Sequence, residues 1–341
     1  MKIAADRPAV TLDRIMAAAR VLLGVADATP MVPSPHMEAT YGQPFWLKLE
    51  NMQPIGAFKL RGALNAVAAL PDGTRGVTCC STGNHGRGVA YAARARGIPA
   101  TICMSNLVPQ AKFDGIRALG AEVRIVGTSQ DDAQVECERL VAEEGFTEIS
   151  PFDDPLVIAG QGTIGLEILA AAPDIDTLLV PLSGGGLAAG VASAAKAINP
   201  AIRVIGISMD RGAAMYESLK AGHPVEVEEV PSLADSLGGG IGLMNRLSYP
   251  ICRTLLDDVV IVSEEAIYRA MQTLYYEDRI VAEGACVVGI AAVQTGRVQL
   301  TGPTATVITG RNADMDLFTR VVTGQDVVLG DLTLRGAPYA A

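Results

Sequence analysis

Residues 177–189 read Thr-Leu-Leu-Val-Pro-Leu-Ser-Gly-Gly-Gly-Leu-Ala-Ala, and this stretch contains the pattern that decides the fold. The apolar run at 177–181 predicts a buried strand, the glycines at 184–186 predict a tight turn, and the small residues at 188–198 predict a helix. Strand, turn and helix in this order are typical of a parallel sheet covered by helices.

The same pattern repeats along the chain, which predicts an α/β fold. Other β-rich runs that alternate with helical stretches lie at residues 45–49, 76–80, 100–103, 122–126, 203–207, 259–262 and 304–308. Most are too apolar for one solvated face, which indicates parallel strands with helices on both sides. A Pro-Phe-Asp-Asp-Pro loop at 151–155 ends one series of units. We therefore predict a small domain at 76–149, a large domain formed by 1–75 and 150–321, and a tail at 322–341 with one strand at 326–334.

The composition sets limits on the function. The chain has 341 residues, a formal net charge of −10, 49% hydrophobic residues and 19% charged residues. A chain this negative, without a cluster of Lys and Arg, would repel a phosphate backbone, so no nucleic acid is expected as a partner. The first ten residues lack the apolar stretch of a secretion signal, and no apolar run is long enough for a bilayer. We predict a cytoplasmic protein without a membrane partner.

The cysteines show no metal-binding or redox pattern. There is no CxxC pair and no histidine at zinc-ligand spacing among Cys79, Cys80, Cys103, Cys137, Cys252 and Cys286. A free thiol in an apolar run behaves as a small buried hydrophobe. The pattern predicts reduced thiols in the core, without a function in the chemistry.

The first motif that can carry chemistry is Gly-Ala-Phe-Lys-Leu-Arg-Gly at residues 56–62, at the start of a predicted helix. Most lysines on helices are solvated charges. The amine of Lys59 would form a Schiff base only if burial or a neighbouring charge lowers its pKa. The motif alone leaves both interpretations open.

The second motif is Ser-Thr-Gly-Asn-His-Gly at residues 81–86, between a strand and a helix. Free N–H groups at a helix start, together with hydroxyl groups, suit a carboxylate or a phosphate. Capping of the helix by Ser81 or Thr82 explains the same residues, and His85 alone is more often a turn residue.

Two further motifs follow predicted strands and would reach the same edge of a sheet. Ser-Gly-Gly-Gly-Leu at residues 183–187 allows the backbone to wrap a phosphate closely. It lacks the Gly-Lys-Ser/Thr end of a Walker A motif and the spacing of a dinucleotide motif, so a simple tight turn is the alternative. Thr-Gly-Arg-Asn at residues 309–312 has little meaning by itself.

Together and in this order, these motifs resemble those of the fold-type II pyridoxal-phosphate enzymes, in particular the serine racemase and threonine dehydratase branch. The resemblance spans residues 28–321 and includes Leu-Lys-Leu-Glu-Asn at 47–51 and Ile-Ala-Gly-Gln-Gly-Thr at 158–163. It implies a tryptophan synthase β-like fold with two parallel-sheet α/β domains and the active site between them. It also implies pyridoxal 5′-phosphate as cofactor, a small amino acid as substrate and a homodimer.

The resemblance assigns a role to each matching position of this chain. Lys59 would be the Schiff-base lysine, and Phe58 would pack beside the cofactor ring. Asn84 would bind the ring hydroxyl, and Thr309 would face the pyridine nitrogen. The phosphate would be held by Ser183, Gly184, Gly185, Gly186 and Leu187. The substrate carboxylate would be held by Ser81, Thr82, Asn84 and His85.

The chain departs from the family pattern at two places. Serine racemase has an acidic metal site in the segment that matches residues 207–216, where this chain has Ser208, Gly212 and Ala214. No metal is therefore expected, although Asp210 lies close by in sequence. Arg311 replaces a glycine of the commoner pattern, and it either pairs with a nearby carboxylate or selects the distal group of the substrate, with a packing role as the safer interpretation.

Within this family the closest likeness is to the hydroxyectoine-utilisation dehydratase. It rests on Ser-Met-Asp-Arg-Gly-Ala-Ala-Met at residues 208–215 and Gly-Arg-Asn at 310–312. This likeness implies a hydroxylated amino acid derived from ring-opened hydroxyectoine as substrate. Threonine or serine is the expectation for the broader family.

The resemblance implies a lyase in which the freed amine of Lys59 removes the Cα proton and the β-hydroxyl group leaves. Hydrolysis of the product would then give a keto acid and ammonia. Two alternatives remain open. With the Thr82 hydroxyl as a second catalytic group on the opposite face, the chain would be an amino-acid racemase. A non-catalytic nucleotide-binding regulator would use the glycine motif alone.

Overall fold

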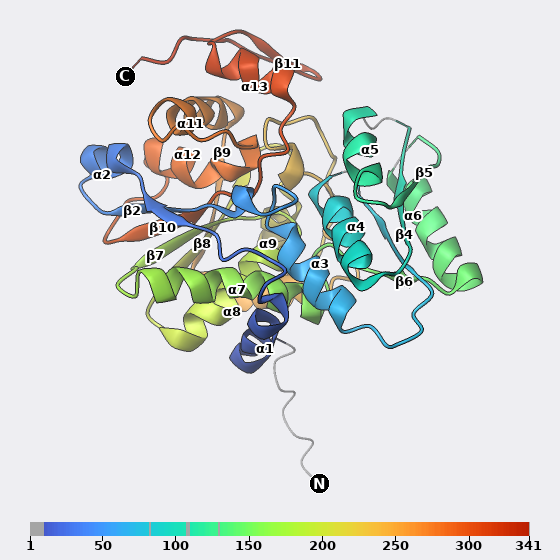
Figure 1. The fold of residues 1–341 in the computed structure, drawn as a ribbon. Coiled ribbons are helices and arrows are strands. Elements are labelled where there is room, and N and C mark those ends of the chain that lie inside the picture. Colours follow the sequence, from blue (N-terminus) through green and yellow to red (C-terminus); the bar gives the residue numbers. More distant parts are fainter. Residues whose placement is uncertain (1–9, 82, 107–109, 129, 341) are drawn as a thin grey trace.

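The computed structural model describes residues 10–81, 83–106, 110–128 and 130–340, and most of its strands form two sheets (Figure 1). The larger sheet has the order β1-β2-β10-β7-β8-β9, and the smaller has the order β5-β4-β3-β6. Only β1 is antiparallel to its neighbour in these two sheets. The strands of the larger sheet are β1 Met31–Pro33, β2 Phe45–Lys48, β7 Thr177–Pro181, β8 Arg203–Met209, β9 Asp258–Val262 and β10 Thr304–Val307. Those of the smaller are β3 Val77–Cys80, β4 Ala100–Met104, β5 Glu122–Ile125 and β6 Thr147–Glu148.

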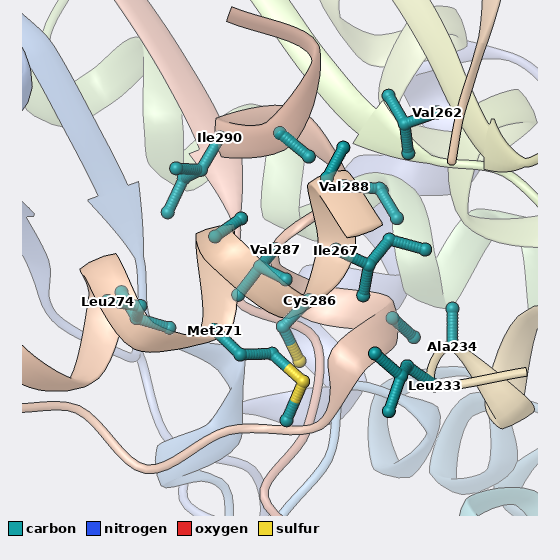
Figure 2. Packing of buried hydrophobic residues seen from close by; sticks show 14 of the residues in the cluster. Leu233, Ala234, Val262, Ile267, Met271, Leu274, Cys286, Val287, Val288 and Ile290 are labelled. Carbon is teal, nitrogen blue, oxygen red and sulfur yellow. The ribbon is translucent and has the colours of Figure 1, made fainter. Parts of the chain in front are cut away.

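Helices cover both faces of the larger sheet, as its apolar strands require. On β7, Leu178 and Val180 pack into the core beneath α7 and α8, whereas Leu179 packs into the core beneath α11 and α12. Figure 2 shows this second core, where α11 and α12 meet the segment that carries Leu233. The helices of the first side are α1 Leu12–Leu22, α7 Pro155–Ala171, α8 Gly186–Ile198, α9 Ala214–Ala221 and α10 Ser248–Leu255. Those of the second are α2 Pro35–Tyr41, α11 Glu264–Tyr276, α12 Val288–Gln294 and α13 Met315–Val322.

The smaller sheet is also covered on both faces. Its main core lies beneath α3 Lys59–Ala68, α4 Asn84–Arg96 and α5 Gln110–Arg117, and α6 Gln130–Arg139 packs on the other face. Helix α3 contacts both α4 and α7, so it joins the two sheet units. All four strands of this sheet lie within the segment 76–149 that we predicted as the small domain.

The strands predicted from the sequence are present, and the differences concern short elements. Strands β1 and β6 were not predicted, because two or three residues carry too little periodicity. The single strand predicted at residues 326–334 is wrong: the chain forms a hairpin of β11 Val327–Leu329 and β12 Leu332–Leu334. Gly330, with a φ of 62°, allows the chain to reverse there.

Two other sequence expectations can be compared with the fold. All six cysteines are free and buried, as predicted. No helix in the described part of the chain is both long and apolar enough to cross a membrane.

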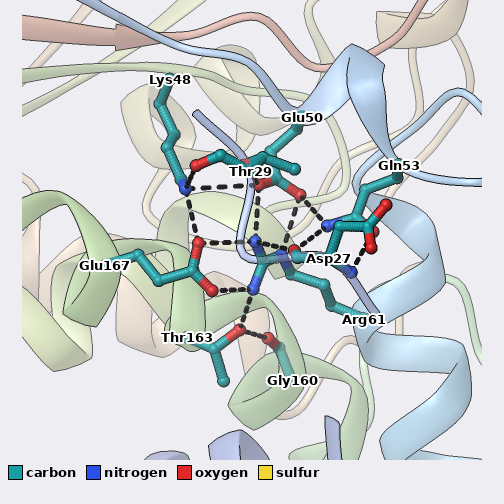
Figure 3. A network of polar contacts seen from close by, with 9 residues as sticks. All are labelled: Asp27, Thr29, Lys48, Glu50, Gln53, Arg61, Gly160, Thr163 and Glu167. Atoms are coloured by element: carbon teal, nitrogen blue, oxygen red, sulfur yellow. Dashed lines mark hydrogen bonds and ion pairs between the residues drawn. The ribbon is translucent and has the colours of Figure 1, made fainter. Parts of the chain in front are cut away.

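A buried network of charges fixes the start of α3 to its surroundings (Figure 3). The Arg61 guanidinium donates to Glu50 at 2.7 and 2.8 Å and to Glu167 on α7 at 2.6 and 2.8 Å. Lys48 on β2 donates to Glu167 at 2.5 Å. Burial raises the pKa of Glu50, but the charge and hydrogen bonds of Arg61 outweigh burial and lower it. The 47–51 motif therefore holds α3 against β2 and α7.

Candidate active site

Lys59 is the first residue of α3, and its amine is not a solvated charge. The Nζ atom donates to the carbonyl oxygen of Pro151 at 2.7 Å and lies 5.4 Å from the centre of the Phe58 ring. Burial lowers the pKa of Lys59 to about 8. Most helix lysines stay charged in water, so this environment is the one that makes an amine a usable nucleophile or base.

The backbone brings the Lys59 motif against the Thr309 motif and against α4. The Phe58 N–H donates to the Thr309 carbonyl at 3.0 Å, and the Arg311 N–H donates to the Gly56 carbonyl at 2.9 Å. On α4, a Cβ atom at Gly88 would lie only 3.1 Å from the Lys59 carbonyl oxygen. Glycine therefore permits the close approach of α4 to the start of α3.

Thr309 is buried two residues after the end of β10, and Cys286 supports its loop. The Cys286 sulfur lies 3.2 Å from the Thr309 hydroxyl oxygen, donates to the Gly310 carbonyl at 3.0 Å and accepts from the Gly310 N–H at 3.1 Å. Burial raises the pKa of Cys286 to about 12, so the thiol is neutral. Thr309 thus presents a neutral hydroxyl group with a fixed backbone.

The glycine motif forms the turn between β7 and α8, and each glycine is required by space or conformation. A Cβ atom at Gly184 would lie 2.2 Å from the Phe152 ring, and one at Gly186 would lie 2.8 Å from the Phe152 Cα atom. Gly185 has a φ of 88°. The first N–H groups of α8 have no partner inside the helix, so they are available for an anion. Because Phe152 follows Pro151, the segment that accepts the Lys59 hydrogen bond also supports this turn.

Two residues of α10 hold the carbonyl side of the glycine motif. The Ser248 hydroxyl donates to the Gly184 carbonyl at 2.7 Å, and the Cys252 thiol donates to the Gly185 carbonyl at 3.6 Å. The Asp153 carboxylate accepts from the N–H groups at the start of α10, including that of Ser248 at 2.9 Å. Because these hydrogen bonds hold the Gly184 and Gly185 carbonyl groups towards α10, the N–H groups of the turn face away from α10.

Within the motif at residues 81–86, Ser81 caps the helix, and other residues are available for the site. The Ser81 hydroxyl accepts from the Gly83 and Gly86 N–H groups at 3.4 and 3.2 Å, which is the capping interpretation. His85 Nε2 donates to the Ile149 carbonyl at 2.7 Å, while burial, with a further contribution from Lys59, lowers the pKa of His85 to about 3. The imidazole is therefore neutral, and a carboxylate at His85 would bind its backbone N–H. Thr82 lies outside the described residues.

Asn84 is placed beside the Thr309 loop by contacts with the larger sheet unit. Its Nδ2 atom donates to both carboxylate oxygens of Glu283, at 3.0 and 3.1 Å. Its Oδ1 atom accepts from Asn312 Nδ2 at 2.6 Å. The four segments that carry Lys59, Asn84, Thr309 and the glycine turn therefore converge on one site.

Two further expectations from the sequence concern Arg311 and the segment at residues 207–216. Arg311 is exposed and packs beside Gly56, and its side chain makes no hydrogen bond or ion pair with a carboxylate of the residues that the structure describes. The Ser208 hydroxyl donates to the Met209 sulfur at 3.5 Å. Among the described residues, no group of three or more His, Cys, Asp or Glu could hold a metal ion.

The sequence alone did not identify the supporting residues Asp153, Ser248, Cys286 and Glu283 as part of the site. Asp153 lies in the Pro-Phe-Asp-Asp-Pro loop, which was interpreted only as a break between units. Glu283 is 4% exposed and follows no glycine motif. The one signal in the sequence is its Glu-Gly-Ala-Cys context, an acidic residue before an otherwise apolar helix.

This chain is similar to known proteins in both sequence and structure. The model of the family described as pyridoxal-phosphate dependent enzyme matches residues 23–310. A Sinorhizobium fredii protein, provisionally named a threonine dehydratase, is 56% identical over 299 residues, which cover 87% of this chain and 90% of that protein. The L-threonine ammonia-lyase of Thermotoga maritima is 40% identical over 316 residues, covering 92% of this chain and 78% of the relative. The structure of maize serine racemase matches with a TM-score of 0.87 at 33% identity, covering 92% of this chain and 96% of the other.

Proposed function

This chain belongs to the family of pyridoxal-phosphate dependent enzymes, and we propose that it is a dehydratase that eliminates the β-hydroxyl group of a small hydroxy amino acid. It has the fold-type II architecture, uses pyridoxal 5′-phosphate and is a lyase of the threonine dehydratase kind. The alternative of a non-catalytic regulator is therefore set aside. The observation that carries the proposal is the Lys59 amine, with a pKa of about 8, at the point where the four motifs converge.

The residues present fit the cofactor. With a pKa of about 8, roughly a tenth of the Lys59 amine is neutral at pH 7, compared with well under a hundredth for an ordinary lysine. The amides of the glycine turn would hold the phosphate, the Asn84 carboxamide the ring hydroxyl, and the Thr309 hydroxyl the pyridine nitrogen. When bound there, the cofactor supplies the electron sink for the negative charge that develops at Cα.

The proton transfer falls to Lys59. When its amine is free, the neutral Nζ atom accepts the Cα proton, and the Pro151 carbonyl at 2.7 Å keeps the amine from turning away. The N–H groups at the start of α4 hold the substrate carboxylate. The electron pair of the former Cα–H bond then forms a double bond between Cα and Cβ, while the β-hydroxyl group leaves as hydroxide with the electrons of the Cβ–O bond. The released enamine hydrolyses in water to a keto acid and ammonia.

Two finer questions are part of the proposal. We propose that Arg311, whose guanidinium is exposed and unpaired among the described residues, selects the distal group of the substrate. A hydroxylated amino acid derived from hydroxyectoine is the candidate that the 208–215 and 310–312 segments support. The likeness to serine racemase keeps racemisation, with the Thr82 hydroxyl on the second face, as the other candidate activity.

A substrate screen tests the proposed function. The purified protein, loaded with pyridoxal phosphate, is incubated with single enantiomers of threonine, serine and hydroxylated diamino acids. Keto acid, ammonia and the inverted enantiomer are measured in each reaction. We expect keto acid and ammonia in equal amounts to exceed the inverted product. An inverted enantiomer as the main product would favour the racemase, and a protein that binds no cofactor would contradict both.

The pH dependence of cofactor attachment tests the Lys59 environment. Only the neutral amine attacks the cofactor, so the rate should rise with pH and level off above about 8, falling roughly tenfold for each pH unit below that value. Stopped-flow absorbance of the cofactor-stripped protein mixed with pyridoxal phosphate measures this rate. A lysine model amine with an ordinary pKa serves as the reference. Because it reacts with the same cofactor, any pH effect that comes from titration of the cofactor appears in both reactions. A midpoint near 10 would contradict the assignment of Lys59.

A further inference from the structure

Glu283 is a buried carboxylate on which donors from three other segments converge. It precedes the short helix η4 Gly284–Cys286. Besides the Asn84 carboxamide, the Ser236 hydroxyl donates to Oε2 at 2.5 Å, and the Asn312 N–H donates to Oε1 at 2.8 Å. A Cβ atom at Gly310 would lie 2.4 Å from Oε1, so the glycine of the Thr309 loop gives the carboxylate its space.

The hydrogen bonds of Asn312 and Glu283 together fix the orientation of the Asn84 carboxamide. Asn312 Nδ2 donates one hydrogen to the Ile55 carbonyl at 3.0 Å and the other to Asn84 Oδ1. The Ile55 carbonyl can only accept, so the Asn312 atom that faces it is the Nδ2 donor, and the Asn84 atom that faces this donor is therefore Oδ1. Asn84 Oδ1 is then committed as an acceptor, and its Nδ2 group faces Glu283. The Nδ2 atom lies 3.1 and 3.0 Å from the two carboxylate oxygens, an arrangement in which both oxygens can share one of its two hydrogens and the other hydrogen can reach a ligand.

The hydrogen-bond partners of Glu283 indicate that its carboxylate orients Asn84. Burial raises the pKa of Glu283, as does the nearby Asp235, whereas the hydrogen bonds from Ser236 and Asn84 lower it. Arg87 lies one turn further along α4 than Asn84. The charge of Glu283 acts on the pKa of Arg87 and raises it, against the larger effect of burial. Among the described residues, the groups that contact the Glu283 carboxylate are neutral donors, so it is placed to accept hydrogen bonds rather than to pass on a proton.

We propose that Glu283 is a positioning residue that aims the remaining N–H of Asn84 at the ring hydroxyl of the cofactor. This inference rests on the proposed function, because it takes Asn84 as the partner of that hydroxyl. Asn84 begins a helix of the smaller sheet unit, while Glu283, Ser236 and Asn312 belong to the larger one. The carboxylate therefore sets the orientation of a group on one unit from the other.

The variant Glu283→Gln tests this inference with the full-length protein and pyridoxal phosphate. Glutamine keeps the size of the side chain, but its amide can donate as well as accept, so the Asn84 carboxamide is free to rotate. A donor to the ring oxygen stabilises the ionised hydroxyl, and its loss favours the neutral form, which absorbs at shorter wavelength. We expect absorbance to move from the long-wavelength band to the near-ultraviolet band, and the dissociation constant of the cofactor to rise about tenfold.

A matched control and a double variant separate positioning from packing. Glu264→Gln changes another buried carboxylate, which accepts from the Leu233 N–H at 2.8 Å, and should leave both readouts within twofold of the parent. Asn84→Ala should give the same spectral change as Glu283→Gln, and the double variant should add little to it. If Glu283→Gln does not fold, Glu283→Asp is used instead. Aspartate keeps the carboxylate, but its shorter side chain moves the carboxylate away from Asn84, so the spectrum should shift in the same direction.

The outcomes distinguish this inference from the proposed function. A parent protein that forms no chromophore with the cofactor would contradict the proposed function itself. A parent that forms it, together with a folded Glu283→Gln protein of unchanged spectrum and affinity, would overturn the positioning role alone. Additive effects of the Asn84 and Glu283 variants would overturn it as well.

Discussion

Replacing Lys59 with alanine is expected to abolish turnover and the borohydride-reducible chromophore while the protein remains folded. The lost amine is both the covalent tether of the cofactor and the base at Cα, and removal of a general base alone slows a reaction by about 10²- to 10⁴-fold. The structural cost should be small, since within the described part of the chain the amine makes one hydrogen bond, to Pro151, and takes no part in the buried charge network. A net contribution of about 1 kcal/mol is typical of such a bond.

The measurement combines activity, absorbance after borohydride reduction, and the thermal unfolding midpoint. Lys196→Ala is the matched control, because Lys196 also lies on a helix and, among the described residues, its amine pairs with Asp257 alone, at 2.7 Å. That variant should retain the chromophore and the activity of the parent. Retained turnover with unchanged absorbance in Lys59→Ala would show that another residue carries the cofactor.

Replacing Arg61 with methionine should lower the free energy of unfolding by about 3–5 kcal/mol, the range found when one partner of a buried ion pair is removed. The Glu50 carboxylate is fully buried and would keep only Thr29, Gln53 and the Lys48 amine, which is 3.9 Å away. Glu167 would lose two hydrogen bonds as well. Urea unfolding measures the change, provided that the slopes of the two curves agree.

Arg124→Met is a matched control for the burial of the charge. Arg124 also contacts several carboxylates, including Glu122 at 2.8 Å and Glu136 at 2.7 Å, but its side chain is 29% exposed. Ion pairs near the surface contribute about 0–1 kcal/mol, so this variant should be nearly as stable as the parent. Equal losses in the two variants would contradict the structural role of the buried network.

The stability difference between the parent and Arg61→Met should also depend on pH. The pKa of Glu50 is lowered in the folded protein, so its contribution to stability is present above the ordinary carboxyl pKa. This contribution is lost as the pH falls through the lowered value, where the folded state must take up a proton. The difference between the two proteins should therefore narrow in acid.

The sequence by itself determined the α/β class, the order of the strands along the chain and the motifs of the site. Apolar runs such as Thr177–Pro181 are buried on both faces, so their composition alone predicts parallel strands beneath helices. A glycine turn between a strand and a helix has one typical geometry, which is why residues 183–187 and 81–86 could be placed at the ends of strands. These features depend on neighbours a few residues apart, which a sequence displays directly.

Only the tertiary structure decided the ionisation and orientation of the site groups. The amine of Lys59 has a lowered pKa because it is buried, and it donates to the carbonyl of Pro151, ninety-two residues away. Asn84 is oriented by Glu283 and Asn312, which lie 199 and 228 residues further along the chain. Burial and hydrogen-bond direction arise from contacts between distant segments, and no local pattern of residue types records which distant atoms will meet. For that reason the motifs indicated where the site lies, while the supporting residues Glu283, Cys286 and Ser248 became evident only in the fold.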